Sequence, residues 1–128
     1  MAKERLVLCD TNIIIEFYKE NDSVLRKLQA IGQESIAVSI ITAGELFFGA
    51  LNKKELRKIN QDIAHLHLLH MDSAIGECFI DLINNYSLSH GLSLPDGLIA
   101  ATSLIKDIPL YTLNKKDFKY INGIQLYQ

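Results

Sequence analysis

Residues 6–12 have the sequence LVLCDTN, in which an apolar run ends abruptly on polar side chains. Four consecutive apolar residues of this kind predict a short buried strand. Asp10 and Asn12 follow the run directly. A second stretch, LPDGLIAATSLI at residues 94–105, places Asp96 at the start of an apolar helical run. Both stretches raise the same question, which is whether the aspartate only begins a helix or carries out chemistry.

Strand-like and helix-like segments alternate on both sides of these two stretches. The predicted strands are residues 5–9, 35–39, 65–70, 108–112 and 123–127. The predicted helices are residues 13–19, 23–31, 42–52, 54–64, 72–89 and 95–106, and Gly91 stands where a C-cap of the fifth is expected. Strands and helices in alternation predict an α/β fold. We expect a three-layer α/β/α sandwich with a central, mostly parallel sheet of four to five strands.

Length and composition limit the classes of protein that fit. The chain has 128 residues, 48% hydrophobic and 22% charged, which predicts one domain over residues 1–128. No apolar run approaches the length of a membrane span, and we expect no signal peptide and no membrane association. The two cysteines form no CxxC motif, which favours reduced thiols and a cytoplasmic location.

The net charge of −2 argues against a general nucleic-acid binder, whose surface is usually basic. Any contact with nucleic acid must therefore rely on local charge. One basic cluster, KKELRK at residues 53–58, is typical of a solvated helix face. A second cluster surrounds Asp117 and contains Lys115, Lys116 and Lys119.

Four acids follow or precede the predicted strands in a way that brings them to one edge. Asp10 follows the first strand, Glu45 lies early in the helix after the second, and Asp117 follows the fourth. Asp96 opens the helix that leads into the fourth strand. Ligands of open α/β sheets bind beyond the carboxyl ends of the strands. We therefore expect these carboxylates to converge.

Each of these polar residues also has a purely structural explanation. TAGE at residues 42–45 fits a capping box that pairs Thr42 with Glu45, and NKKD at residues 114–117 resembles an N-cap followed by an acid. Asp96 follows Pro95 at a helix start, and Asn12 can cap its own helix. Taken together, however, clustered carboxylates repel one another unless a cation lies among them. Oxygen ligands suit Mg²⁺ or Mn²⁺, and the lack of Cys or paired His ligands argues against zinc.

The histidines and Thr112 are further candidates for a functional role. His65 and His67 in HLHLLH are expected on one face of an exposed edge strand, and His90 precedes Gly91 at a helix C-terminus, where a cation suits the helix dipole. Neither placement predicts catalysis. Thr112 ends the fourth strand, and its hydroxyl can donate to a carboxylate or a phosphate oxygen.

The motifs CDTN, TAGELFFGA, LPDGLIAATSL and YTLNKKDF resemble the PIN (PilT N-terminal) domain family, most closely the VapC-type toxins of prokaryotic toxin-antitoxin pairs. The resemblance extends over essentially the whole chain, in the order of the family. It implies catalytic acids at Asp10, Glu45, Asp96 and Asp117. Of these, the implied metal ligands are Asp10, Asp96 and Asp117, and the supporting polar residues are Asn12, Thr112 and Asn114. Some relatives have a further acid where this chain has Asn114.

The resemblance implies a hydrolase, a Mg²⁺- or Mn²⁺-dependent endoribonuclease that acts as the toxin of a type II toxin-antitoxin system. Glu45 would bind metal or orient the attacking water as a general base. Lys115, Lys116 and Lys119 would hold the RNA backbone. The implied protein partners are a second copy of the chain, forming a homodimer, and a small antitoxin.

The helix that carries Glu45 bears on these partners. Its sequence ELFFGAL contains Phe47, Phe48 and Leu51. One side of the helix is then either a partner surface or part of the core.

Two other classes of protein remain open at this point. A phosphorelay receiver domain has a similar length and acids at strand ends, which would be Asp10 and Asp72, with Thr112 and Lys115 as its switch pair. Such a domain needs an acidic pair after the first strand, and here Cys9 precedes Asp10. The third class is a PIN fold that binds RNA or protein without turnover.

Overall fold

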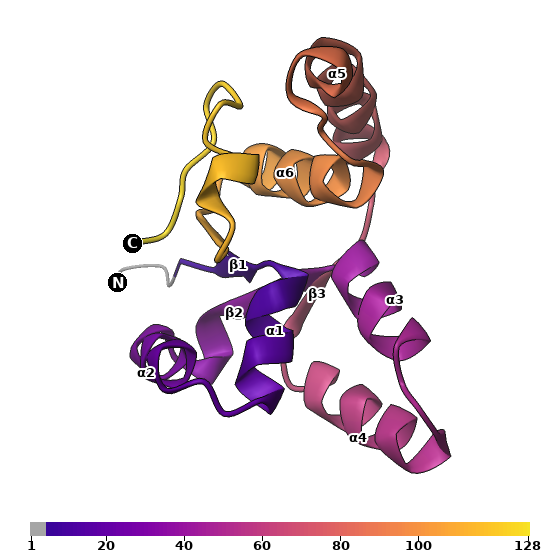
Figure 1. Ribbon diagram of the computed structural model, residues 1–128, viewed down its shortest axis with the longest axis vertical. Coiled ribbons are helices and arrows are strands. Elements are labelled where there is room, and N and C mark those ends of the chain that lie inside the picture. Colours follow the sequence, from indigo (N-terminus) through magenta and orange to yellow (C-terminus); the bar gives the residue numbers. More distant parts are fainter. Residues whose placement is uncertain (1–4) are drawn as a thin grey trace.

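The computed structural model describes residues 5–128. Its elements are β1 (Val7–Cys9), α1 (Thr11–Tyr18), α2 (Asp22–Ile31), η1 (Gln33–Ser35), β2 (Ile36–Ser39), α3 (Ile40–Phe48), α4 (Lys53–Ile63), β3 (His67–Leu69), α5 (Ser73–His90), α6 (Leu94–Lys106), β4 (Leu110–Tyr111) and η2 (Lys115–Asp117). The strands form one parallel sheet in the order β3-β2-β1-β4. Helices α5 and α6 lie on one face, and α1, α2 and α4 lie on the other (Figure 1). The predicted three-layer α/β/α architecture is confirmed.

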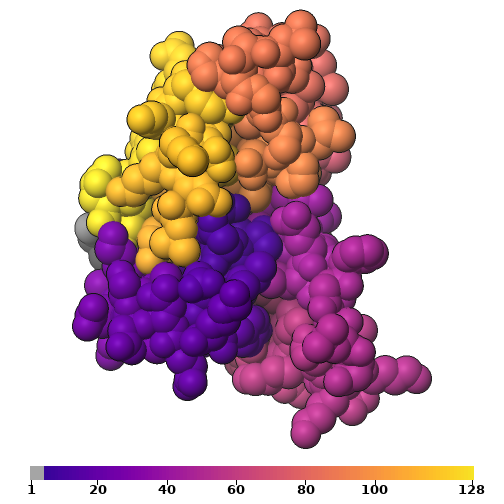
Figure 2. Space-filling view, viewed as in Figure 1, coloured from indigo at the N-terminus to yellow at the C-terminus, as the bar shows by residue number. Residues whose placement is uncertain are grey.

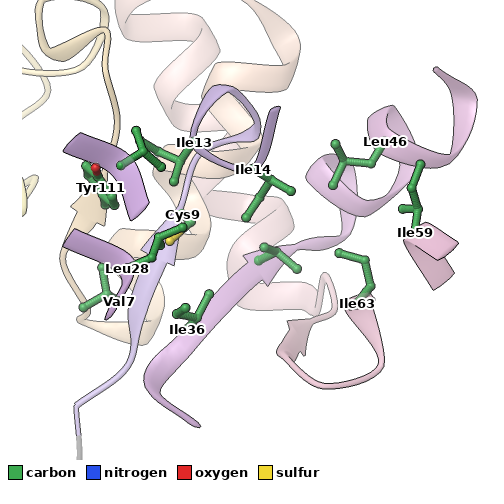
Figure 3. Close-up of a cluster of buried hydrophobic side chains, with 12 residues drawn as sticks. Val7, Cys9, Ile13, Ile14, Leu28, Ile36, Leu46, Ile59, Ile63 and Tyr111 are labelled. Carbon is green, nitrogen blue, oxygen red and sulfur yellow. The ribbon is translucent and has the colours of Figure 1, made fainter. Parts of the chain in front are cut away.

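Two apolar clusters hold the layers together, and alternation along the strands assigns residues to them. Val7 and Cys9 of β1 belong to the cluster beneath α1–α4, whereas Leu8 belongs to the cluster beneath α5 and α6. Successive side chains of a strand point to opposite faces of the sheet. The three-residue strand β1 therefore contributes side chains to both clusters. Figure 3 shows strand residues such as Val7 and Ile36 directed at the helices of the first cluster.

The predicted fifth strand, residues 123–127, is wrong as a strand. It contributes one parallel bridge, between Leu110 and Leu126. Gly123 has a φ of +86°, so the chain still turns at the first residue of this segment. In addition, β4 contains only two residues. Two backbone hydrogen bonds, each 2.8 Å long, hold the segment beside β4. Leu110 N–H donates to Gln125 O, and Tyr127 N–H donates to Leu110 O.

The strand order fixes where the chain changes direction in the sheet. From β1 the chain proceeds outward to β2 and then β3, and it returns to place β4 on the opposite side of β1. Such a switch point opens a crevice at the carboxyl ends of the two strands. Asp10 follows β1 and Thr112 follows β4, so both residues lie at this crevice. Among residues 5–128, no helix combines the length and apolar character needed to cross a membrane.

Helices α5 and α6 approach each other closely at Gly97. A β-carbon at this position would lie 2.8 Å from Ile83 Cδ1 and 3.4 Å from the Phe79 ring. Gly97 is buried. A side chain here would therefore require Ile83 and the Phe79 ring to shift just after Asp96.

We predict that Gly97→Val lowers the free energy of unfolding by about 2 kcal/mol, because its side chain overpacks the contact between α5 and α6. Gly76→Ala is the matched control in α5, since nothing lies within 4 Å of a β-carbon there. That change should raise the free energy of unfolding by up to about 1 kcal/mol through helix propensity. Urea denaturation measures both, and an equally stable Gly97→Val variant would contradict the packing described.

Candidate active site

Asp10 is a buried carboxylate held by two neighbouring threonines. It is the N-cap of α1, and its Oδ1 accepts a hydrogen bond of 2.8 Å from Thr11 N–H. Its Oδ2 accepts a hydrogen bond of 2.7 Å from the Thr112 hydroxyl across the crevice. Burial raises the pKa of Asp10, the two hydrogen bonds oppose this, and Glu45 and Asp117 add to the increase. The site therefore contains a carboxylate that is costly to ionise without a positive charge.

Asp96 is half-buried, and its carboxylate does not cap the helix. Helix α6 begins with Ser93 as its N-cap, whose hydroxyl accepts a 3.2 Å hydrogen bond from Asp96 N–H. Burial raises the pKa of Asp96 to about 6, with further contributions from Asp10, Asp117 and Glu45. The explanation of Asp96 as a simple helix-start residue does not account for this environment.

Glu45 has a different partner from the one that its sequence context suggests. The predicted capping box is wrong, because α3 begins at Ile40 and Ser39 caps it through Thr42 N–H at 3.2 Å. Glu45 instead accepts a 2.7 Å hydrogen bond from the Thr11 hydroxyl. Thr11 and Thr42 hydroxyls are also 2.9 Å apart.

The sequence does not predict the contacts that Thr11 makes in the site. Thr11 connects α1 to α3 through hydroxyl contacts with residues more than 30 positions away. Its only local signal is its place between Asp10 and Asn12, two residues that the sequence does single out.

The loop after β4 is organised by Thr112. The Thr112 hydroxyl accepts a 3.0 Å hydrogen bond from Asn114 N–H while it donates to Asp10. Asn114 makes no side-chain capping bond to η2, so the predicted N-cap is wrong, and its side chain is exposed. Asp117, which is half-buried, ends η2. The contact of this loop with the start of α1 is visible in Figure 2, where amber meets indigo.

Asn12 does not cap α1, because Asp10 occupies that position. Its Oδ1 atom is buried and has no hydrogen-bond partner in the described chain. A buried carbonyl oxygen without a partner is costly, and such an atom can accept a hydrogen bond from a water or bind an ion. The first turn of α1 therefore contains an unused oxygen ligand close in sequence to Asp10.

The donor set matches a hard divalent cation. It consists of carboxylate and amide oxygens, which are the ligands that Mg²⁺ and Mn²⁺ prefer. The pKa of Asp96 responds to the other three acids, so the four carboxylates share one electrostatic environment. Over residues 5–128, no three Asp, Glu, His or Cys side chains are already close enough to hold one ion. The chemistry of the residues fits a metal, and binding would have to draw the carboxylates together.

The three predicted RNA-binding lysines differ in their surroundings. Lys116 lines a polar hollow of about 230 Å³ that it shares with Asp96 and Asp117. Lys115 donates to Gln128 Oε1 at 3.3 Å, and Lys119 is exposed. A larger and more apolar hollow of about 440 Å³ lies between α1, α2 and α4, and none of the four acids lines it.

The proposed receiver-like site is not formed. Asp72 caps α5 through Ile75 N–H at 2.9 Å and lies 3.6 Å from Lys106 Nζ. The strand order also differs from the 2-1-3-4-5 order of receiver folds. Among the histidines, His67 Nε2 lies 2.8 Å from Glu34 O and His65 lines the apolar hollow, so neither accompanies the acids.

Comparisons with known proteins agree with this architecture. The family model named PIN domain matches residues 7–124. The chain belongs to the PIN domain family. One curated relative of this PIN domain is Ribonuclease VapC1 of Methanocaldococcus jannaschii, 30% identical over 98% of this chain and 89% of that protein.

Solved structures give the same result. A toxin-antitoxin complex from Klebsiella pneumoniae matches with a TM-score of 0.79 and 29% identity over 92% of this chain and 94% of that chain. FitAcB from Neisseria gonorrhoeae has a TM-score of 0.80 and 26% identity over 96% and 97% of the two chains. DNA-bound VapBC from Salmonella typhimurium, at 20% identity over 96% and 97% and a TM-score of 0.82, shares the fold.

The acidic cluster predicts an unusual effect of Asp96→Asn on stability. The folded chain raises the pKa of Asp96 from 3.8 to about 6. Protonation of Asp96 therefore favours the folded state, and this contribution to the free energy of unfolding is present at pH 4 and lost as pH rises through 6. Removing the charge should add on the order of 1 kcal/mol at pH 7.5 after screening by water, or about 3–5 °C in Tm without metal. At pH 4 the variant should melt like the wild type.

Asp72→Asn is the control, because Asn also caps helices and Asp72 is exposed. Its Tm should not rise at either pH, because the hydrogen bond from Ile75 N–H and the nearby Lys106 lower the pKa of Asp72 and favour its charged form. Differential scanning calorimetry in EDTA measures these shifts. An Asp96→Asn variant that melts no higher than the wild type at pH 7.5 would refute the crowding of the four acids.

Proposed function

We propose that this PIN domain is a divalent-metal-dependent endoribonuclease, the toxin of a type II toxin-antitoxin pair. The observation that carries the proposal is that burial and carboxylates from separate elements raise the pKa of Asp10 and Asp96, and that Asp10 lies at the switch point between β1 and β4. Similarity to Ribonuclease VapC1 supports RNA as the substrate. Phosphodiester hydrolysis at a cluster of acids requires a cation, because both the acids and the RNA are negative.

In this proposal Asp10, Asp96 and Asp117 hold Mg²⁺ or Mn²⁺. The bound ion would lower the pKa of a water ligand and neutralise charge on the phosphate. Asn12 Oδ1 supplies a further oxygen, directly or through a water. Thr112 fixes the rotamer of Asp10, and Asn114 fixes Thr112 through its backbone N–H.

Glu45 is assigned as the general base that takes the proton of the attacking water. Its carboxylate is oriented by the Thr11 hydroxyl, which leaves the second carboxylate oxygen available for that water. Thr11 is adjacent to Asp10, so one residue couples the orientation of the base to the backbone beside the metal ligand. These roles make Thr11 a positioning residue.

The protein partners of the proposal are a small antitoxin and a second copy of the chain. The Klebsiella pneumoniae structure is described as a toxin-antitoxin complex, and its matched chain shares 29% identity with this one. Phe48, the last residue of α3, and Leu51, in the bend before α4, are 93% and 86% exposed, whereas Phe47 packs against the core. Exposed apolar side chains of this size favour a protein contact over permanent exposure to water.

The competing proposal is a PIN fold that binds without turnover. The acids argue against it, because a binding module has no need for a buried Asp10 and a half-buried Asp96 that destabilise one another. Only an assay for cleavage separates the two functions.

We predict that the purified chain cleaves single-stranded or looped RNA in Mg²⁺ or Mn²⁺ and does not cleave it in excess EDTA. Asp117→Asn should reduce the rate by at least about 100-fold, since it removes one metal ligand. Asp72→Asn should retain activity, because Asp72 only caps α5. Labelled RNA resolved on denaturing gels measures cleavage, and undiminished cleavage in EDTA would exclude the metal mechanism.

A second prediction concerns RNA affinity. Changing Lys115, Lys116 and Lys119 together to Ala should weaken binding and reduce the slope of log Kd against log salt, because fewer counterions are released. The matched control changes Lys53, Lys54 and Arg57, which removes the same charge from exposed positions of α4. Fluorescence anisotropy at several salt concentrations measures both, and equal slopes in the two triple variants would place the RNA elsewhere.

A further inference from the structure

Three aromatic rings gather at the edge of the acidic site. His90, the last residue of α5, stacks on Tyr120, with ring centroids 4.1 Å apart and an interplanar angle of 9°. Tyr86 contacts both rings edge-on, at 5.8 Å from His90 and 5.2 Å from Tyr120. The Tyr86 hydroxyl accepts a 3.2 Å hydrogen bond from Asn122 N–H. The rings therefore form a fixed platform between α5 and the segment after η2.

This platform shares a hollow with two of the acids. His90 and Tyr120 line the same 230 Å³ space as Asp96, Asp117 and Lys116. Its volume is below the range of about 300–1,000 Å³ that holds drug-sized ligands. Gly91, also in the lining, has a φ of +68° and carries no side chain that could fill the space. The hollow is therefore suited to one planar group of modest size.

We propose that this hollow is a nucleobase subsite in which one base of single-stranded RNA stacks on the free face of His90. The proposal rests on the proposed ribonuclease function and adds to it a residue that positions the substrate. Lys116 would contact the phosphate of the same nucleotide, and Asp96 and Asp117 would lie beside the backbone to be cleaved. Stacking on aromatic rings is the usual way in which proteins hold unpaired bases.

The exposure of His90 favours this role over simple packing. Tyr120 is half-buried and joins the apolar cluster beneath α5 and α6, whereas the His90 side chain is exposed. One face of His90 lies on Tyr120, and because the side chain is exposed, the opposite face is where a base would stack. Tyr120 thus connects the platform to the core and His90 presents it to the substrate. Stacking favours large rings, so we expect a purine at the bound position.

The experiment compares His90→Ala with His90→Phe, which retains a ring. His65→Ala is the matched control, an exposed histidine that lines the apolar hollow remote from the acids. Each protein is given intact RNA and a series of RNAs with one abasic nucleotide at each successive position around the cleaved bond. Initial rates give kcat/KM, and anisotropy in EDTA gives Kd.

We expect His90→Ala to lower kcat/KM for intact RNA by roughly tenfold, as loss of one stacked base does. His90→Phe should stay within about twofold of the wild type, and His65→Ala should be unchanged. One abasic position should cost the wild type the same factor and cost His90→Ala nothing more. This lack of additivity identifies the base that stacks, which a general structural defect would not produce.

Other outcomes overturn the subsite. Equal kcat/KM for wild type and His90→Ala, or equal sensitivity of both to every abasic position, would do so while leaving cleavage established. If the wild type cleaves no RNA in either metal, the proposed function fails and the Kd values decide the subsite. Tighter binding of intact RNA by wild type than by His90→Ala supports it, and equal binding refutes it.

Discussion

The 2.7 Å hydrogen bond from the Thr112 hydroxyl to Asp10 Oδ2 connects the ends of β4 and β1 at the point where the sheet changes direction. Burying a carboxylate is costly unless donors compensate for lost water. Thr112 supplies one donor and Thr11 N–H the other. Because Thr112 also accepts from Asn114 N–H, the same hydroxyl sets the path of the loop that carries Asp117. The buried carboxylate of Asp10 is thus connected, through Thr112, both to the end of β4 and to the loop that carries Asp117.

Satisfying Asp10 does not remove the repulsion among the acids. The pKa of Asp96 is raised to about 6 by burial and by three other carboxylates. A sequence selected for stability alone would not place four acids at one edge, so the cluster marks a site where the fold accepts a cost for function. The excess negative charge is also what would attract a divalent cation to this site.

The sequence predicts the layers well and the local contacts poorly. The pattern of apolar residues identified four strands and six helices, because the spacing of apolar side chains along each element reflects the face that it buries. The capping box at Thr42 failed because Ser39, three residues earlier, caps α3. Thr11 was not predicted, since its contacts with Thr42 and Glu45 depend on how α1 and α3 pack. Residues 123–127 have strand-like composition, but beside the two-residue β4 they form a single bridge, between Leu126 and Leu110.

The caps of α3 and α6 share a feature that bears on the chemistry. Ser39 caps α3 and Ser93 caps α6. Serine hydroxyls therefore accept the hydrogen bonds of the backbone N–H groups for which the sequence also offered Glu45 and Asp96. Glu45, in the second turn of α3, and Asp96, in the first turn of α6, therefore do not cap the backbone of their helices. The N-terminus of α6 still carries partial positive charge, which stabilises an acid in its first turn. That charge is too small to neutralise four carboxylates, and the remaining imbalance is what a bound cation would relieve.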